Sequence, residues 1–176
     1  MTTRGHCILC HGFESGPDAT KVTALAEAAH ALGWTSERPD FTDLDARRDV
    51  SDLGDVPARL QRLHGLAHAA AARGPVVLAG SSLGAWIVGA VSMQVPVQGL
   101  FLLAPPIRMR EAHPMQAARV PTSIVHGWGD ELIPVVDVIG WAHLHRASLL
   151  LVDDDHRLGA HVDACANAFA QLLRSL

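Results

Sequence analysis

The chain has 176 residues, a net charge of −4 with neutral histidines, 11 histidines, three cysteines and no tyrosine. This length predicts a single domain over residues 1–176, and an apolar fraction of 49% predicts a packed core rather than a disordered chain. The negative charge argues against nucleic-acid binding, which requires a basic surface.

The cysteines and the N-terminus bear on the compartment of the protein. Cys7 and Cys10 lie far in sequence from Cys165, and three is an odd number, so no disulfide framework is indicated. The N-terminal residues lack the apolar segment of a signal peptide, and no run approaches the roughly 18 apolar residues of a membrane span. We therefore expect a cytoplasmic protein that does not associate with membranes.

Short apolar runs alternate with amphipathic segments along the chain. The first run, HCILC at residues 6–10, predicts a strand, and the apolar spacing over 21–32 predicts a helix that ends at Gly33. Residues 34–39 predict a more polar strand. It should lie near a sheet edge, because Pro39 has no backbone N–H to donate to a neighbouring strand. Residues 40–55 are acidic and predict a loop.

The second part of the chain continues this alternation. A helix is predicted from Pro57 to residue 72, with its buried face formed by Leu60, Leu63, Leu66 and Ala67. The remaining predicted elements are strands at 75–79, 99–104, 122–126 and 148–152, and helices at 83–93, 134–144 and 161–173. Strands that alternate with helices predict an α/β fold: a mostly parallel sheet of about six strands with helices on both faces.

A serine motif follows one of the buried strands. Residues 80–84 read GSSLG, a G-x-S-x-G sequence between the predicted strand at 75–79 and the predicted helix at 83–93. In that setting the motif forms a strained turn that exposes the central serine hydroxyl at the end of the sheet. We therefore predict that Ser82 is a nucleophile. The alternatives are that Ser82 is only a turn residue or, less favoured by the motif, that Ser81 is the nucleophile.

An acid and a base follow two later strands. Asp130 ends the loop HGWGD after the strand at 122–126, and His156 ends DDDH after the strand at 148–152. The order Ser82, Asp130, His156 is that of a serine–acid–histidine triad on an α/β sheet. Glu131 competes with Asp130, although we expect Glu131 to begin the next helix, and His161 competes with His156. We expect the carboxylates at 153–155 to form a solvated loop that favours protonated His156.

The oxyanion site must be formed by backbone groups, because the chain has no tyrosine hydroxyl to contribute. The sequence predicts that the N–H groups of Leu83 and Phe13 bind the oxyanion, with Gly12 giving the backbone freedom to turn inward. Candidate residues of the substrate pocket are His11, Gly12 and Trp128, with Phe13 as a second aromatic wall.

The other histidines and the cysteines predict no metal or cofactor. His64 and His68 lie one helical turn apart without a third ligand nearby, and we expect His11 and His126 to hydrogen-bond neighbouring loops. The remaining histidines fall on predicted helices or irregular segments and share no spacing with a partner ligand: His6, His30, His113, His143 and His145. The CILCH sequence at 7–11 matches a haem-attachment motif, but on a strand its two thiols face opposite sides, so we expect both to be buried.

The motifs together resemble the α/β-hydrolase superfamily, and within it the small lidless esterase-like members of bacteria. They are HGF at 11–13, GSSLGA at 80–85, HGWGDELIP at 126–134 and DDDHRL at 153–158. The resemblance implies a serine-hydrolase fold that needs no cofactor. The sequence departs from the superfamily in lacking the opening hairpin and any cap domain, since residues 105–121 leave room only for a loop or short helix.

The expected function is hydrolysis of an ester or thioester of a small acyl substrate through an acyl-enzyme on Ser82. Two alternatives remain: an inactive hydrolase-fold protein that binds or scaffolds a partner, and an amidase or peptidase. A dienelactone-type hydrolase is disfavoured because that reaction requires cysteine at position 82. The oligomeric state is open.

Overall fold

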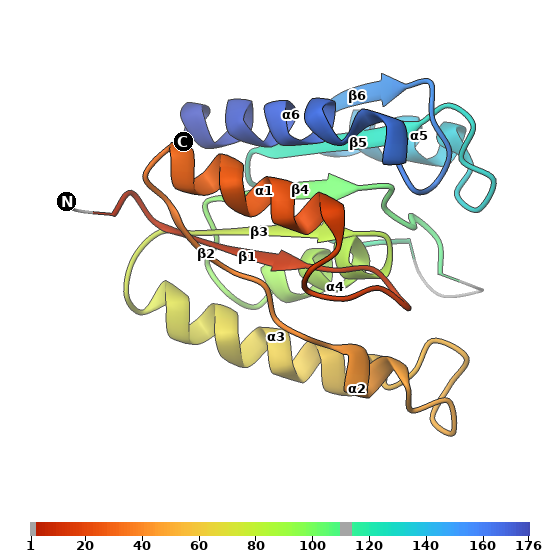
Figure 1. The fold of residues 1–176 in the computed structure, drawn as a ribbon, viewed down its shortest axis with the longest axis horizontal. Helices are drawn as coiled ribbons and strands as arrows, with labels where there is room; N and C mark the ends of the chain where they lie inside the picture. Colours follow the sequence, from red (N-terminus) through yellow and green to blue (C-terminus); the bar gives the residue numbers. More distant parts are fainter. Residues whose placement is uncertain (1–2, 110–113) are drawn as a thin grey trace.

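Six strands form one sheet in the computed structural model, which describes residues 3–109 and 114–176 (Figure 1). The strands are β1 (His6–Cys10), β2 (Thr35–Glu37), β3 (Val76–Ser81), β4 (Gly99–Leu103), β5 (Thr122–Gly127) and β6 (Ser148–Val152). Their order across the sheet is β2-β1-β3-β4-β5-β6, and every neighbouring pair is parallel. The predicted α/β fold is confirmed, with β2 at an edge as expected.

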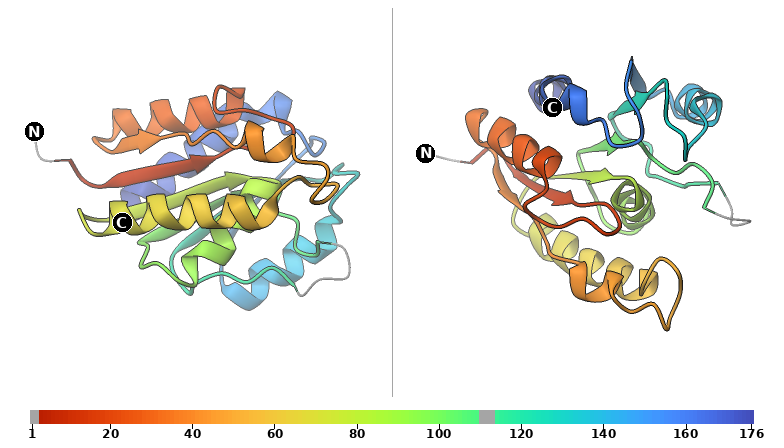
Figure 2. Two further views of the ribbon diagram at one scale, coloured as in Figure 1. Left: turned by 90° about the horizontal axis from the view of Figure 1, so that it is seen from below. Right: turned by 45° about the vertical axis from the view of Figure 1, so that its right-hand side comes forward.

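Helices cover both faces of this sheet, as Figures 1 and 2 show. The helices are α1 (Thr20–Ala31), α2 (Thr42–Asp45), α3 (Val56–Ala71), α4 (Leu83–Ser92), α5 (Val135–His145) and α6 (Val162–Ser175), with the 3-10 helix η1 (Gly159–His161) before α6. The core residues divide into two clusters, one under α1 and α6 and the other under α3, α4 and α5. The closing helix thus begins as η1, two residues before its predicted start.

Strand β1 shows how the two clusters arise from the alternation of a strand. Cys7 and Leu9 pack with α1 and α6, whereas Ile8 and Cys10 pack on the opposite face. Both thiols are fully buried and unpaired, and burial raises the pKa of each to about 12. The expectation that the two cysteines are buried on opposite faces is confirmed.

Helix α3 begins at Val56, one residue before the predicted start at Pro57, and its buried face differs from the prediction. The Asp55 carboxylate caps the helix by accepting a hydrogen bond from Ala58 N–H at 3.0 Å. The fully buried positions include Arg59 and Leu63, while Leu60 and Leu66 are half-buried. The prediction missed Arg59 because a charged side chain is buried only when a partner compensates its charge.

The segment 40–55 was predicted as a loop, and it contains the short helix α2. Leu44 and Asp45 of α2 are buried, so a tertiary contact rather than an apolar period stabilises this turn. The segment after β4 has no helix within the described residues 105–109 and 114–121. His113 lies outside the described residues. Among the described residues, no helix combines the length and the hydropathy needed to cross a bilayer.

The strand order positions the site. The chain leaves β1 for β2 on one side, and β3 then pairs with β1 on the other side. At such a switch point the loops after β1 and β3 diverge to opposite faces and leave a crevice at the carboxyl ends of the strands. The HGF motif follows β1, and the GSSLG motif spans the end of β3 and the turn into α4.

Candidate active site

Ser82 occupies a sharp turn between β3 and α4. Its φ is 51° and its ψ is −119°, a conformation that a residue with a side chain rarely adopts and that costs about 1–3 kcal/mol. The turn is held by hydrogen bonds from Ser82 N–H to the Leu103 carbonyl and from Ala85 N–H to the Ser82 carbonyl, each at 2.8 Å. The predicted strand–turn–helix setting of the G-x-S-x-G motif is confirmed.

The motif's glycines allow backbone segments to touch. A Cβ atom on Gly80 would lie 2.4 Å from the backbone of Gly84. A Cβ atom on Gly84 would lie 2.5 Å from the Cys10 carbonyl and 2.6 Å from the His11 carbonyl. The close approach therefore joins the serine turn directly to the end of β1.

The structure brings Ser82, His156 and Asp130 together from three loops. His156 Nε2 lies 2.9 Å from Ser82 Oγ, and His156 Nδ1 lies 2.8 Å from Asp130 Oδ2. The Asp130 side chain is fully buried and that of His156 is 13% exposed. This arrangement satisfies the hydrogen-bond geometry that a nucleophile, a base and an orienting acid require.

Each competing residue has a different partner. His161 Nδ1 lies 3.0 Å from Asp154 Oδ2, so this histidine pairs with a different carboxylate. Glu131 was predicted to begin the next helix, but it lies in the loop before α5. Its carboxylate accepts a hydrogen bond from the backbone N–H of His156 at 3.4 Å.

The acidic loop at 153–155 was expected to be solvated, but the Asp154 side chain is only 9% exposed. Asp154 accepts hydrogen bonds from the backbone N–H groups of Asp155 and Ala160 as well as pairing with His161. Burial acts to raise the pKa of Asp154, but these hydrogen bonds outweigh it and lower the pKa. Asp154 therefore organises its own loop.

His126 braces the loop that carries Asp130. The side chain is fully buried, and Nε2 donates to the Ile133 carbonyl at 3.1 Å while lying 3.6 Å from Asp130 Oδ2. Burial lowers the pKa of His126. The expectation that this residue hydrogen-bonds a neighbouring loop is confirmed.

An open cleft of about 980 Å³ lies over Ser82. The predicted oxyanion residues Phe13 and Leu83 both border it, as do Ser82 and His156. The rest of its lining combines apolar side chains with charged ones, among them Leu53, Met109, Ile133, Lys21, Arg108 and Arg157. Trp128 does not line the cleft and is 56% exposed, so its predicted place in the pocket is wrong.

The loop after β1 confirms that His11 hydrogen-bonds a neighbouring loop, but it differs from expectation in two other respects. The φ of Gly12 lies outside the left-handed region, and a Cβ atom there would make only a tight contact of 3.3 Å with the Ser81 carbonyl. His11 borders the cleft but is fully buried. Its ring accepts a hydrogen bond from Phe41 N–H at 3.0 Å and lies 2.7 Å from the Gly12 carbonyl. His11 therefore supports the loop and offers no side-chain surface to a substrate.

Buried charges beneath this loop escaped sequence reasoning. Arg59 and Asp45 form an ion pair with an Nη1–Oδ1 distance of 3.1 Å, and their side chains are 0% and 6% exposed. The only sequence signal is that Arg59 precedes the buried Leu63 by four residues on the same helical face.

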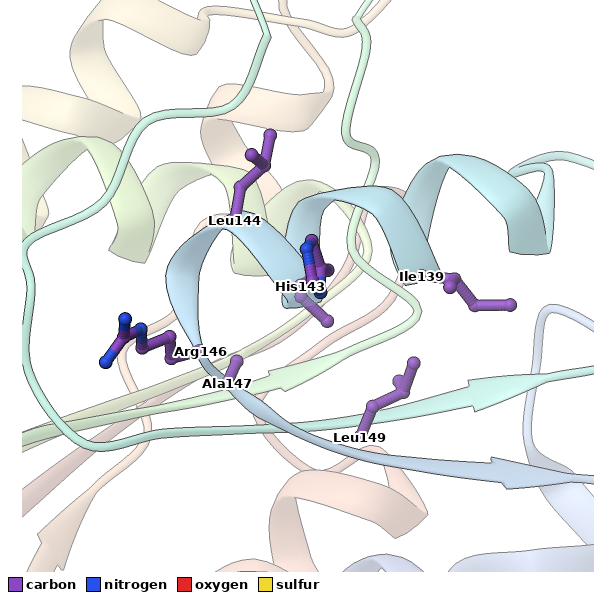
Figure 3. Close-up of a pocket in the computed structure, with 7 residues that line it drawn as sticks. Ile139, His143, Leu144, Arg146, Ala147 and Leu149 are labelled. Carbon is purple, nitrogen blue, oxygen red and sulfur yellow. The ribbon is translucent and has the colours of Figure 1, made fainter.

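A second pocket lies between α5 and β6 and shares no lining residue with the cleft over Ser82. It has a volume of about 670 Å³, and Figure 3 shows Ile139, Leu144 and Leu149 around it together with His143 and Arg146. No nucleophile or acid lines this pocket, so it offers no counterpart to the triad.

His64 and His68 stack on α3 with ring centroids 6.1 Å apart. Within the described ranges, no group of three or more His, Cys, Asp or Glu residues could hold a metal ion.

The chain closely matches a solved structure from Xanthomonas campestris pv. campestris that is assigned to the hydrolases of the alpha/beta superfamily. The sequences are 67% identical, the match covers 98% of this chain and 100% of the other, and the TM-score is 0.97. This chain belongs to the α/β-hydrolase superfamily.

More distant superfamily structures share the fold. A lidless α/β serine hydrolase from Xanthomonas campestris is 20% identical over 99% of this chain and 83% of its own, with a TM-score of 0.78. An esterase from Pyrococcus furiosus is 13% identical over 98% of this chain and 82% of its own, with a TM-score of 0.77. No family model and no curated protein matches the sequence. In this α/β hydrolase, no strand precedes β1 and no cap domain covers the cleft within the described residues.

Proposed function

We propose that this α/β hydrolase is a serine hydrolase that cleaves an ester or thioester of a small acyl substrate through an acyl-enzyme on Ser82. The observation that supports the proposal is the hydrogen-bonded series from Ser82 Oγ through the His156 ring to Asp130 Oδ2. An ionised carboxylate only accepts hydrogen bonds, so His156 Nδ1 is the donor and Nε2 keeps its lone pair for the serine proton.

The reaction begins when His156 Nε2 takes the Ser82 proton and the serine oxygen attacks the acyl carbonyl carbon. The N–H groups of Phe13 and Leu83 stabilise the negative oxygen of the tetrahedral intermediate. The intermediate collapses to the acyl-enzyme, and His156 passes its proton to the departing alcohol or thiol. Water then attacks the acyl-enzyme with His156 again as base, releasing the acid and restoring Ser82.

One part of the cleft lining is apolar, which supports an acyl substrate. Phe13, Leu53, Met109 and Ile133 border it and pack against the core cluster under α3, α4 and α5. They offer an apolar surface beside Ser82 on which an acyl chain loses contact with water.

The proposal is tested with the purified protein, a short p-nitrophenyl ester, an acyl thioester and the p-nitroanilide of the same acyl group. Ser82→Ala should reduce turnover to near the uncatalysed rate while the far-UV circular dichroism spectrum stays unchanged. A fluorophosphonate probe should label the wild type at Ser82 alone and leave the variant unlabelled. A folded wild type that neither reacts with the probe nor hydrolyses any of these substrates would indicate a binding protein instead, and a preference for amides would indicate an amidase.

A further inference from the structure

We propose that the buried Arg59–Asp45 ion pair is a positioning device for the loop at residues 11–14, which holds the Phe13 N–H toward the oxyanion of the reaction. The inference rests on the proposed function, because it concerns the oxyanion site of the same reaction. Arg59 and Asp45 are positioning residues, since neither lines the cleft.

Arg59 holds the beginning of the loop. Its Nη2 donates to the His11 carbonyl at 3.0 Å, and its guanidinium lies 4.6 Å from the centre of the Phe41 ring. The side chain is fully buried, and burial lowers its pKa, which means that the fold holds this charge against a solvation penalty. Replacing a buried ion pair by apolar side chains is often neutral or stabilising, so stability alone gives little reason for this pair.

Asp45 holds the end of the loop. Its Oδ1 faces Arg59, and its Oδ2 accepts a hydrogen bond from the backbone N–H of Glu14 at 3.3 Å. Glu14 has a φ of 54°, the left-handed conformation that a residue with a side chain adopts only under constraint. The ion pair thus joins the His11 carbonyl to the Glu14 N–H, on either side of Gly12 and Phe13.

His11 carries this constraint to the peptide between Gly12 and Phe13. Because Phe41 N–H donates to His11 Nε2, the ring proton lies on Nδ1, which donates to the Gly12 carbonyl at 2.7 Å. In a trans peptide the C=O and N–H bonds point in opposite directions. Fixing the Gly12 carbonyl toward His11 therefore turns the Phe13 N–H away from the ring.

A neighbouring ion pair provides a matched control. Arg62 lies on α3 like Arg59 and pairs with Asp43 of α2 through two bonds of 2.7 and 2.8 Å. It links the same two helices as the Arg59–Asp45 pair, but its hydrogen bonds go to Asp43 and the Asp40 carbonyl rather than to the loop at 11–14.

The experiment compares Arg59→Met with Arg62→Met. For a p-nitrophenyl ester, Arg59→Met should lower kcat about 10- to 100-fold with little change in KM, because a misplaced oxyanion donor weakens only the transition state. A trifluoromethyl ketone, which forms a tetrahedral oxyanion on Ser82, should lose affinity by a similar factor. The Arg62→Met variant should match the wild type in all three quantities.

Two results would overturn the inference: a folded Arg59→Met variant with wild-type kcat and ketone affinity, or equal losses in both arginine variants. If Arg59→Met does not fold, the double variant Arg59→Met/Asp45→Leu removes both charges, and wild-type kcat in that variant also overturns the inference. Failure of the proposed function is distinguishable, because it would appear with Arg59 unchanged: either the wild type would not hydrolyse the substrates, or hydrolysis would survive in the Ser82→Ala variant.

Discussion

The two oxygens of the Asp130 carboxylate have separate partners, and only one of them faces His156. Oδ2 lies 2.8 Å from His156 Nδ1, whereas Oδ1 accepts the backbone N–H groups of Leu132 and Ile133 at 2.9 and 2.8 Å. The backbone of the loop thereby determines which way the side chain at position 130 faces.

Asp130→Asn should leave the loop intact and abolish the function of the base. The amide oxygen must stay at the Oδ1 position to accept the two N–H groups, so the amide NH₂ would face His156 Nδ1. This favours the tautomer with a proton on Nε2, which cannot accept the serine proton. We expect kcat for a p-nitrophenyl ester to fall about 10⁴-fold, the magnitude known for the acid of a serine-protease triad. The exposed Asp153→Asn is the control; similar losses in both variants would contradict this role.

Gly84→Ala should destabilise the fold by about 1–3 kcal/mol, because overpacked sites relax only at the expense of their neighbours. The new Cβ atom would lie 2.5 Å from the Cys10 carbonyl, which is backbone and cannot rotate away. Gly65→Ala on α3 is the opposite case, since its Cβ meets nothing within 4 Å and should stabilise the helix by about 0.5–1 kcal/mol. Urea unfolding of both variants measures the two changes in the free energy of unfolding. Equal changes would contradict the close contact between Gly84 and the Cys10 carbonyl.

His126 should make the protein less stable as the pH falls below 6.5. Burial lowers its pKa in the folded state from the ordinary value of 6.5, so below that value the unfolded chain binds a proton that the folded chain does not. The contribution of His126 to the free energy of unfolding is therefore fully present above pH 6.5. It decreases as the pH falls toward the folded pKa, by at most about 1.4 kcal/mol per pH unit.

The check is urea unfolding of the wild type and His126→Gln at pH 7.5, 6.5 and 5.5. Glutamine keeps an N–H donor for the Ile133 carbonyl but does not titrate, so the variant should show the shallower pH dependence. Asp130 and His156 face this position in both proteins. Equal slopes would mean that His126 does not titrate on unfolding.

The sequence predicted the elements and the strand-end residues for a common reason. Uninterrupted apolar runs predicted the buried strands, a more polar segment at 34–39 predicted the edge strand, and the 3.6-residue apolar period predicted the helices. A parallel sheet then gathers its strand ends at one edge, which is why Ser82, Asp130 and His156 were predicted before their distances were known. The triad's catalytic role stays a prediction until the substitutions above are made.

The sequence prediction was wrong about the direction of one side chain, Trp128, and it missed one buried charge, Arg59. Trp128 lies between His126 and Asp130 in its loop, yet its side chain faces solvent rather than the cleft.

Residue identity and order along the chain were enough to determine an α/β sheet and the residues at the edge that carries the candidate site. Only the tertiary structure decided that His156 rather than His161 meets Ser82, and that Arg59 lies buried beneath the His11 loop, 48 residues away in sequence. The physical reason is that local periodicity encodes which face of an element is buried. The partner of a buried polar group depends on contacts between distant segments, and no local pattern records them.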